Sequence, residues 1–234
     1  MRGENIIMRV LWITNVPTPS IARDANLSIT PYGGWLVQLA EQLRLIEDVK
    51  LSFLFAQNEK KDAVAGSVDG IDYYGFYKGR FVQENEKEKQ HEEFRKFILN
   101  SQPEVIHIFG TEKEHSYIAL QVCKAIGIEN RVVVSIQGLV SVISKHYYAD
   151  IPLWVRYGYT IRDVIRGNSR QSKKQFEREG KREEYVLKHV QNVIGRTDWD
   201  EACTIRLNPE VHYYKNNETL RQSFYQNQWG YDRC

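Results

Sequence analysis

The strongest constraint on the fold is an alternation of short apolar runs, rich in β-branched residues, with longer segments in which apolar residues recur at helical spacing. The main apolar runs are residues 8–14, 49–55, 105–109, 131–136, 192–195 and 211–214. This alternation is typical of a mostly parallel sheet with helices on its faces. We therefore expect a three-layer α/β/α fold with a mostly parallel sheet, in which the nearly continuous run 131–136 is a strand covered on both faces.

The segments between these runs predict helices and loops. Pro17 and Pro19 end the first strand and begin a long loop, which Gly33-Gly34 closes by opening an amphipathic helix. The other helical segments are residues 84–100, 118–126, 151–190, 199–207 and 218–225. A surface loop is expected over residues 58–70, and a short aromatic strand over residues 71–76. One main domain accommodates all of these elements.

Composition narrows the class of protein. Of 234 residues, 42% are hydrophobic and 26% are charged, and the formal net charge of +2 gives no electrostatic reason to expect a nucleic-acid partner. Cys123, Cys203 and Cys234 have neither CxxC nor Cys/His ligand spacing, so we expect no disulfide framework and no metal site. Unpaired cysteines fit a reducing compartment best, so a cytoplasmic location is expected. The apolar start is interpreted as a buried strand, and no run is long enough to span a membrane.

Polar residues and glycines follow the predicted strands. In an open α/β sheet, ligands bind beyond the carboxyl ends of the strands. The residues at these ends are Asn15, Gly110-Thr111-Glu112, Gln137-Gly138, Arg196-Thr197-Asp198 and Asn216-Asn217-Glu218. If the strands are parallel, these clusters lie along one edge together with Gly33-Gly34. The sequence therefore predicts a binding site along this edge.

Gly33-Gly34 has two interpretations. Two glycines at the start of a helix let backbone N–H groups approach a phosphate at the positive end of the helix dipole. The same pair also serves in an ordinary tight turn. Neither GxGxxG nor GxxxxGK[ST] is present, so no motif supports a dinucleotide cofactor or a P-loop, and there is no GxSxG serine elbow.

Each of the other candidate residues has a structural alternative. Glu112 could hold a sugar hydroxyl or stabilise a helix dipole, and Gln137 could contact a ligand or an internal partner. Arg196 suits a pyrophosphate or a carboxylate, or an internal ion pair with a nearby aspartate. His107, inside a strand, is expected to be a hydrogen-bonded core histidine. His115, near a helix start, is expected to be exposed.

The one local charge asymmetry lies between Arg156 and Lys188, with ten basic and five acidic residues. Trp154, Tyr157 and Tyr159 lie in or next to this segment. Clustered Lys and Arg side chains are attracted to anionic lipids, and aromatic rings favour the membrane interface. The segment is therefore either a solvated basic helix or a peripheral contact with an anionic inner membrane.

Five sequence blocks occur in order along the chain: Gly33-Gly34-Trp35, VIHIFGTE (105–112), SIQGL (135–139), VIGRTDWD (193–200) and YYKNNETLR (213–221). Together they resemble bacterial family 4 glycosyltransferases of the GT-B fold. The resemblance covers nearly the whole chain. It implies two Rossmann-like lobes, of which the first binds mainly the acceptor and the second binds the nucleotide-sugar donor.

The resemblance assigns residues 1–217 to the acceptor-side domain and residues 218–234 to the start of a connection to an absent C-terminal donor-binding domain. It implies a metal-independent, retaining hexosyltransferase of bacterial polysaccharide biosynthesis, which moves a sugar from a nucleotide sugar to a glycan or lipid-linked acceptor. The isolated chain is then expected to be inactive.

By the same resemblance, Gly33 and Gly34 face the donor phosphates, and Glu112, Gln137 and Arg196 line the acceptor side. The adjoining Gly138 and Thr197 belong to the same set of substrate-binding residues. Many relatives carry a histidine where this sequence has Gln137. Because an amide has no useful basicity, we expect Gln137 to position a hydroxyl and not to act as acid or base.

Two other functions stay open at this point. A nucleotide-sugar epimerase with the same two-lobed architecture needs no acceptor alcohol. A non-catalytic module that binds a small ligand needs no second lobe. Product analysis separates the transferase from the epimerase, and ligand affinity of the chain alone separates both from the binding module.

Overall fold

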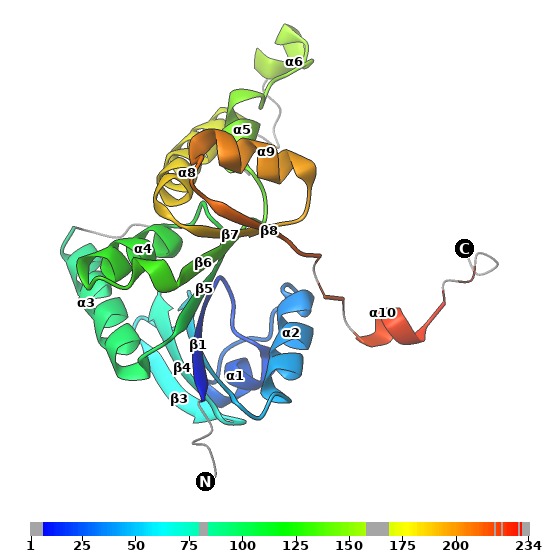
Figure 1. Ribbon diagram of the computed structural model, residues 1–234. Coiled ribbons are helices and arrows are strands. Elements are labelled where there is room, and N and C mark those ends of the chain that lie inside the picture. Colours follow the sequence, from blue (N-terminus) through cyan, green and yellow to red (C-terminus); the bar gives the residue numbers. More distant parts are fainter. Residues whose placement is uncertain are drawn as a thin grey trace.

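The computed structural model of the chain describes residues 7–79, 84–157, 169–217, 219–220, 222–228 and 230. One eight-stranded sheet runs through the described part, as Figure 1 shows. Its strands are β1 (Met8–Thr14), β2 (Val49–Gln57), β3 (Val64–Val68), β4 (Ile71–Tyr77), β5 (Val105–Phe109), β6 (Val132–Ser135), β7 (Asn192–Gly195) and β8 (His212–Lys215). Their order in the sheet is β3-β4-β2-β1-β5-β6-β7-β8. All neighbours are parallel except β3, which runs antiparallel to β4.

Helices cover the sheet from two sides (Figure 1). They are α1 (Pro19–Asp24), α2 (Gly34–Arg44), α3 (Glu84–Ser101), α4 (Glu114–Ala125), η1 (Glu129–Arg131), α5 (Val140–Lys145), α6 (Leu153–Tyr157), α8 (Ser169–His189), α9 (Asp198–Leu207) and α10 (Gln222–Gln226). Helices α1 and α2 lie on one face, and α3, α4, α8 and α9 lie on the other. The expected three-layer α/β/α fold with a mostly parallel sheet is confirmed.

The central strand β1 shows why two cores form. Its side chains alternate between the two faces of the sheet, as in any β-strand. Leu11 and Ile13 join the core under α3, α4 and α8. Val10 and Trp12 join the core under α1 and α2. Because all four side chains are buried, β1 is apolar on both faces, which is typical of a central strand in a parallel sheet.

Strand β6 is covered differently from the prediction. Val132 and Val134 are buried in the core beside α4 and α8. Val133 and Ser135 are only half-buried, because they face the side of the sheet where α1 and α2 lie, and those helices pack over β1, β2 and β4 instead. The expectation that this strand is covered on both faces is therefore wrong, and a partly open sheet face results.

Local structure also differs from the prediction at several further places, among them the following three. The expected loop over residues 58–70 contains β3, in which only Val64 and Val68 are hydrophobic enough to indicate a strand. The expected loop after β1 contains α1, whose first turn Thr18 caps before Pro19 at the helix start. The last predicted helix is shorter, since α10 begins at Gln222; residues 218 and 221 lie outside the described part.

Helix α8 crosses α5 at a glycine. A Cβ atom on Gly180 would lie 2.8 Å from the Ser141 Cα atom and 3.2 Å from the Ser141 backbone nitrogen. The contact involves backbone, which cannot move aside as a flexible side chain does. Only glycine therefore allows α5 and α8 to approach this closely.

We predict that Gly180→Ala destabilises the protein despite the higher helix propensity of alanine. The propensity gain is about 1 kcal/mol, and forcing an extra methyl group into a packed contact costs about 1–3 kcal/mol. The free energy of unfolding, measured with urea, is therefore expected to fall. Gly138→Ala is the control: nothing lies within 4 Å of its Cβ position, and it should change stability by less than about 0.5 kcal/mol. A Gly180→Ala protein more stable than wild type would contradict the close contact.

Candidate functional site

The carboxyl ends of the parallel strands meet at one edge of the sheet. The chain order reverses between β1 and β5, because β1 leads to β2 on one side while β5 leads to β6 on the other. Such a switch point is where ligands bind in open α/β sheets. The described polar residues that were predicted to share this edge follow β1, β5, β6, β7 and β8, so the structure places them along it.

Gly110 lies at the centre of this edge. Its φ of 91° is in the left-handed region that favours glycine. A Cβ atom there would lie 3.2 Å from Glu112 Oε2, 3.6 Å from Gln137 Oε1 and 3.7 Å from Asn15 Nδ2. Glu112, Gln137 and Asn15, which the sequence placed at the ends of three different strands, therefore surround the backbone of Gly110.

Asn15 has an unsatisfied side-chain atom. Its Oδ1 is buried and has no hydrogen-bond partner among the described residues. Leaving a buried acceptor unpaired costs about 1–3 kcal/mol.

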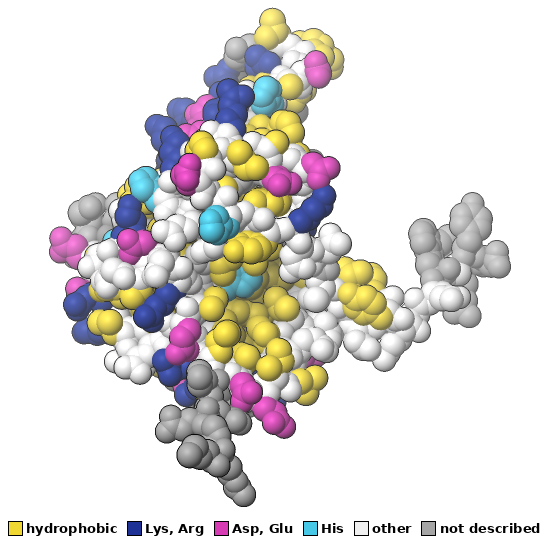
Figure 2. Space-filling model, viewed as in Figure 1, with side chains coloured by type: hydrophobic (Ala, Val, Ile, Leu, Met, Phe, Trp, Pro, Cys, Tyr) yellow, Lys and Arg dark blue, Asp and Glu magenta, His cyan; other side chains and the backbone are white. Residues whose placement is uncertain are grey.

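A pocket opens beside this cluster, on the sheet face that α1 and α2 leave uncovered. It encloses about 580 Å³ of space, counted out to its open mouth. Figure 2 shows hydrophobic side chains gathered in the middle of this face. The lining residues are Trp35, Leu39, His107, Phe109, Ser135, Ile136, Gln137, Ile194, Gly195, Arg196, Asn216, Asn217 and Thr219. We call this the edge pocket.

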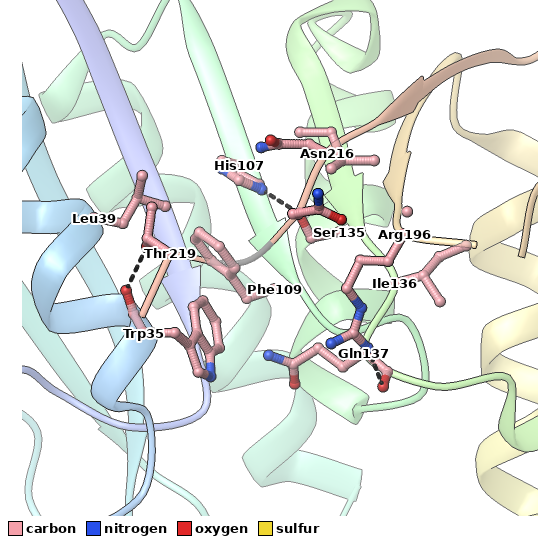
Figure 3. Close-up of a pocket in the computed structure, with 13 residues that line it drawn as sticks. Trp35, Leu39, His107, Phe109, Ser135, Ile136, Gln137, Arg196, Asn216 and Thr219 are labelled. Carbon is pink, nitrogen blue, oxygen red and sulfur yellow. Dashed lines mark hydrogen bonds between the residues drawn. The ribbon is translucent and has the colours of Figure 1, made fainter. Parts of the chain in front are cut away.

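The edge pocket has an aromatic wall and a polar wall (Figure 3). The rings of Trp35 and Phe109 lie with their centroids 5.2 Å apart. Opposite them are Gln137 and Arg196, which come from the ends of β6 and β7. An aromatic surface facing amide and guanidinium groups can bind a ligand that has both an apolar face and hydroxyl groups.

Hydrogen bonds hold the two walls in place. The guanidinium of Arg196 donates to the backbone oxygen of Gln137 over 3.1 Å. On the other wall, the Thr219 hydroxyl donates to the backbone oxygen of Trp35 over 3.2 Å, which ties the segment after β8 to helix α2 (Figure 3). The pocket is therefore built from segments that are far apart in sequence.

The aspartates near Arg196 have other partners. The Asp200 carboxylate accepts from the backbone N–H groups of Arg196 and Thr197, and the Thr197 hydroxyl accepts from the Asp200 N–H. This reciprocal pair caps the first turn of α9. Asp198 forms an ion pair with Lys215. Thr197, a predicted substrate-binding residue, thus has a structural role as a helix cap.

His107 has the hydrogen bond that the sequence predicted. Its Nε2 lies 2.7 Å from the Ser135 hydroxyl, and its ring lies at the floor of the edge pocket. Burial lowers the pKa of His107 to about 3. The ring is therefore neutral at physiological pH and cannot supply a proton there.

The expectation that His115 is exposed is wrong. Its side chain is 2% exposed, and its ring packs against Phe76 of β4, with centroids 5.7 Å apart. Burial lowers the pKa of His115 to about 3, with further lowering by Lys78, Lys113 and Arg182. The polar sequence around the start of α4 gives no sign of this, because β4 and α8 cover the helix end only in the folded chain.

Glu112 and the glycine pair occupy different parts of the edge. Glu112 is buried, and its carboxylate accepts from the Thr111 N–H and pairs with Lys113 at 3.1 Å.

Gly33 has a φ of 79° and caps α2, while Gly34 lines a separate, mainly apolar hollow. Of the helix start, only Trp35 reaches the edge pocket. Gly138, next to Gln137, is half-buried with nothing within 4 Å of its Cβ position.

Glu183 supports the edge and was missed in the sequence. Its fully buried carboxylate accepts from the Thr111 hydroxyl, from the Val140 N–H, and from both the N–H and the hydroxyl of Ser141. Burial raises the pKa of Glu183, while these hydrogen bonds oppose the rise. One side chain of α8 thus fixes the loops after β5 and β6. Within a charge-rich helix, nothing in the sequence separates it from solvated glutamates.

The described residues offer neither a metal cluster nor a membrane-spanning helix. Within residues 7–79, 84–157 and 169–217 and the shorter pieces after them, no cluster of three or more His, Cys, Asp or Glu side chains could hold a metal ion. Cys123 and Cys203 are free thiols, and Cys234 lies outside the described part. None of the described helices is long and apolar enough to cross a membrane.

We predict that the buried histidines make stability pH-dependent. The folded pKa of His115 is about 3, so the unfolded chain, with a pKa of about 6.5, takes up the proton first as the pH falls. The free energy of unfolding should then drop by about 2 kcal/mol for this residue between pH 7 and pH 5. Measured by urea unfolding, the free energy of unfolding of His115→Leu should fall by about 2 kcal/mol less between pH 7 and pH 5 than that of the wild type. Val122→Ala, in the same helix, should keep the wild-type pH dependence; a wild-type slope in His115→Leu would argue against a buried neutral ring.

Comparisons with known proteins add the following. No protein-family model matches the chain, and no curated protein matches it. Solved structures similar to it include a UDP-GlcNAc 2-epimerase from Methanocaldococcus jannaschii, with a TM-score of 0.46 and 10% identity over 90% of this chain and 46% of that one. Another, from E. coli, is described as trehalose-6-phosphate bound with UDP-2-fluoro glucose, with a TM-score of 0.43 and 9% identity over 85% of this chain and 42% of that one. The chain thus spans less than half the length of either.

Proposed function

We propose that this chain is the acceptor-side lobe of a retaining glycosyltransferase, which moves a hexosyl group from a nucleotide sugar to a glycan or lipid-linked acceptor in bacterial polysaccharide biosynthesis. The observation that carries the proposal is the edge pocket. It joins the aromatic wall of Trp35 and Phe109 to the amide and guanidinium groups of Gln137 and Arg196. A sugar ring offers C–H groups on its faces and hydroxyls on its rim, and both match these walls.

The polar residues of the edge would position a hydroxyl. Gln137 and Asn216 line the edge pocket and can each donate and accept hydrogen bonds. Neither Gln137 nor the neutral His107 can serve as a base of useful strength. The contribution of this lobe would be to hold the acceptor hydroxyl within reach of the anomeric carbon. We further propose that Gly33 and Gly34 face the donor phosphates.

The division of the enzyme into two lobes is part of the proposal. Residues 1–217 would form the acceptor-side domain, and residues 218–234 would begin the connection to a donor-binding domain. In support, the edge pocket has walls on the sheet and on α2 but opens outward (Figure 2). A second lobe facing this mouth would exclude water from the reacting groups, which a single open lobe cannot do.

The chain also has a surface suited to a membrane. Helix α6 protrudes from the body of the protein in Figure 1, and its Trp154 is 79% exposed beside the exposed Leu153 and Val155. Exposed Lys174 and Lys181 lie on α8, the basic helix that follows it. We propose that α6 inserts into the interface of an anionic inner membrane while α8 attracts its headgroups. Tyr159 and the rest of residues 158–168 lie outside the described part.

We predict that the edge pocket binds carbohydrate through Trp35. Titration with neutral oligosaccharides, followed by NMR, should shift the indole N–H signal of Trp35 and the side-chain amide signals of Gln137. Trp35→Ala should weaken binding about five- to thirtyfold, because burial against an aromatic ring contributes about 1–2 kcal/mol. Trp154→Ala removes an exposed tryptophan far from the pocket and should bind as wild type does. Equal loss in both variants would contradict the assignment.

Product analysis of the same protein separates the alternative functions. Incubated with several nucleotide sugars and an oligosaccharide, this chain alone should transfer no sugar. Robust formation of a glycosidic bond by the chain alone would overturn the two-lobe proposal. An isomerised sugar nucleotide would favour the epimerase, and tight binding of a nucleotide sugar by the chain alone, without reaction, would favour a binding module.

We predict that membrane contact depends on Trp154. The chain should co-sediment with vesicles that contain anionic phosphatidylglycerol and much less with vesicles of phosphatidylcholine alone. Trp154→Ala should reduce binding several-fold, because its ring loses burial at the interface. Trp35→Ala, in the edge pocket, is the matched control and should sediment as wild type does. Equal partitioning into both kinds of vesicle would remove the electrostatic part of the proposal.

A further inference from the structure

A second hollow lies at the same edge of the sheet, on the side of β4. It is formed by the end of β4, the first turn of α4 and one face of α8, and it encloses about 1630 Å³ out to the solvent. The lining residues are Asn58, Tyr77, Lys78, Gly79, Glu114, Gln175, Arg178, Glu179 and Arg182. We call it the cationic hollow. None of these residues lines the edge pocket.

Basic side chains reach the cationic hollow from different elements. Arg182 is paired with Glu114 at 3.4 Å, and the adjoining Lys113 is paired with Glu112 and with Glu179. Lys78 and Arg178 also line the hollow, and neither is ion-paired within the described part of the chain. The local acids are therefore already engaged, and two cations remain available to a bound anion.

The positive charges around the hollow affect the pKa values of two neighbouring side chains, Lys78 and His115. The pKa of Lys78 is lowered, first by burial and then by Lys113, while nearby glutamates raise it. The buried ring of His115 senses Lys78, Lys113 and Arg182 together. Positive charges from Lys78 after β4, Lys113 before α4 and Arg182 on α8 therefore lie near the first turn of α4, and of these three Lys78 has no paired carboxylate within the described part of the chain.

The first turn of α4 itself is suited to an anion. Lys113 precedes the helix, and its side chain does not cap the free backbone N–H groups. Both ring nitrogens of His115 and the hydroxyl of Ser116 are buried without hydrogen-bond partners among the described residues. The helix dipole and the uncapped N–H groups of α4 thus lie beside the hollow that Lys78 and Arg178 line, whereas His115 and Ser116 are buried and are not among its lining residues.

We propose that the cationic hollow binds a phosphate or diphosphate ester, held by Lys78, Arg178 and the first turn of α4. Glu112 connects the hollow to the edge pocket, because its carboxylate lies beside Gly110 on one side and pairs with Lys113 on the other. A molecule with a sugar in the edge pocket could therefore place its phosphate in the hollow. This second step rests on the proposed function: it makes the acceptor a phosphorylated or lipid-diphosphate-linked sugar.

The test uses inorganic pyrophosphate as the probe. In a ¹⁵N NMR titration at constant ionic strength, pyrophosphate should cause saturable shifts of the backbone amides of Gly79, Glu114 and Ser116. The double variant Lys78→Ala/Arg178→Ala should weaken binding at least about tenfold, as expected for the loss of charged hydrogen bonds. A control, Lys174→Ala/Lys188→Ala, removes the same charge from exposed positions on α8 outside the hollow and should change affinity less than about twofold.

Every outcome of this titration decides the proposal. Loss in the first double variant alone supports the hollow as the site, while equal loss in both indicates diffuse attraction to a basic surface and overturns it. Absence of saturable shifts at α4 also overturns it. Binding of soluble glucose 1-phosphate is compared with binding of vesicles that contain phosphatidic acid. Stronger binding of the first indicates a free phosphate ester as the ligand, and stronger binding of the second indicates a phosphate carried by a lipid. Binding of pyrophosphate without binding of oligosaccharide would support the anion site and reject the proposed glycosyltransferase. Binding of oligosaccharide without binding of pyrophosphate would reject only the anion site.

Discussion

The parallel pairing of β1 with β2 on one side and β5 on the other determines the rest of the structure. It makes β1 a central strand, so that its alternating side chains join a core on each face of the sheet. It also reverses the direction in which later strands are added, which creates the switch point. The polar residues around Gly110 are brought together by this reversal and not by any local sequence motif.

The edge pocket exists because the helices are distributed unequally. The connections that follow β5 place α4, α8 and α9 on one face, while α1 and α2 cover the opposite face only near β1, β2 and β4. The remaining face over β5, β6 and β7 is open, and Trp35 and Phe109 project at its border. A half-covered sheet therefore offers apolar surface beside polar strand ends, the combination from which ligand pockets are commonly built.

The two halves of the edge differ in charge. The edge pocket combines aromatic rings, amides and a neutral His107 with the single guanidinium of Arg196. The cationic hollow carries Lys78 and Arg178 beside a helix N-terminus. Glu112 lies between them. Behind both, the buried carboxylate of Glu183 fixes the loops after β5 and β6, so that the geometry of the edge depends on α8.

Hydrophobic periodicity alone determined the main strands and helices, since the period of a buried face is a local property of the chain. It also located the cluster of Asn15, Glu112 and Gln137, because parallel strands end at a common edge. Only the tertiary structure decided that His115 is buried, that Trp35 reaches a pocket and that β6 has one open face. These facts depend on which helix packs over which strand, between residues tens of positions apart, and no local pattern encodes such long-range contacts.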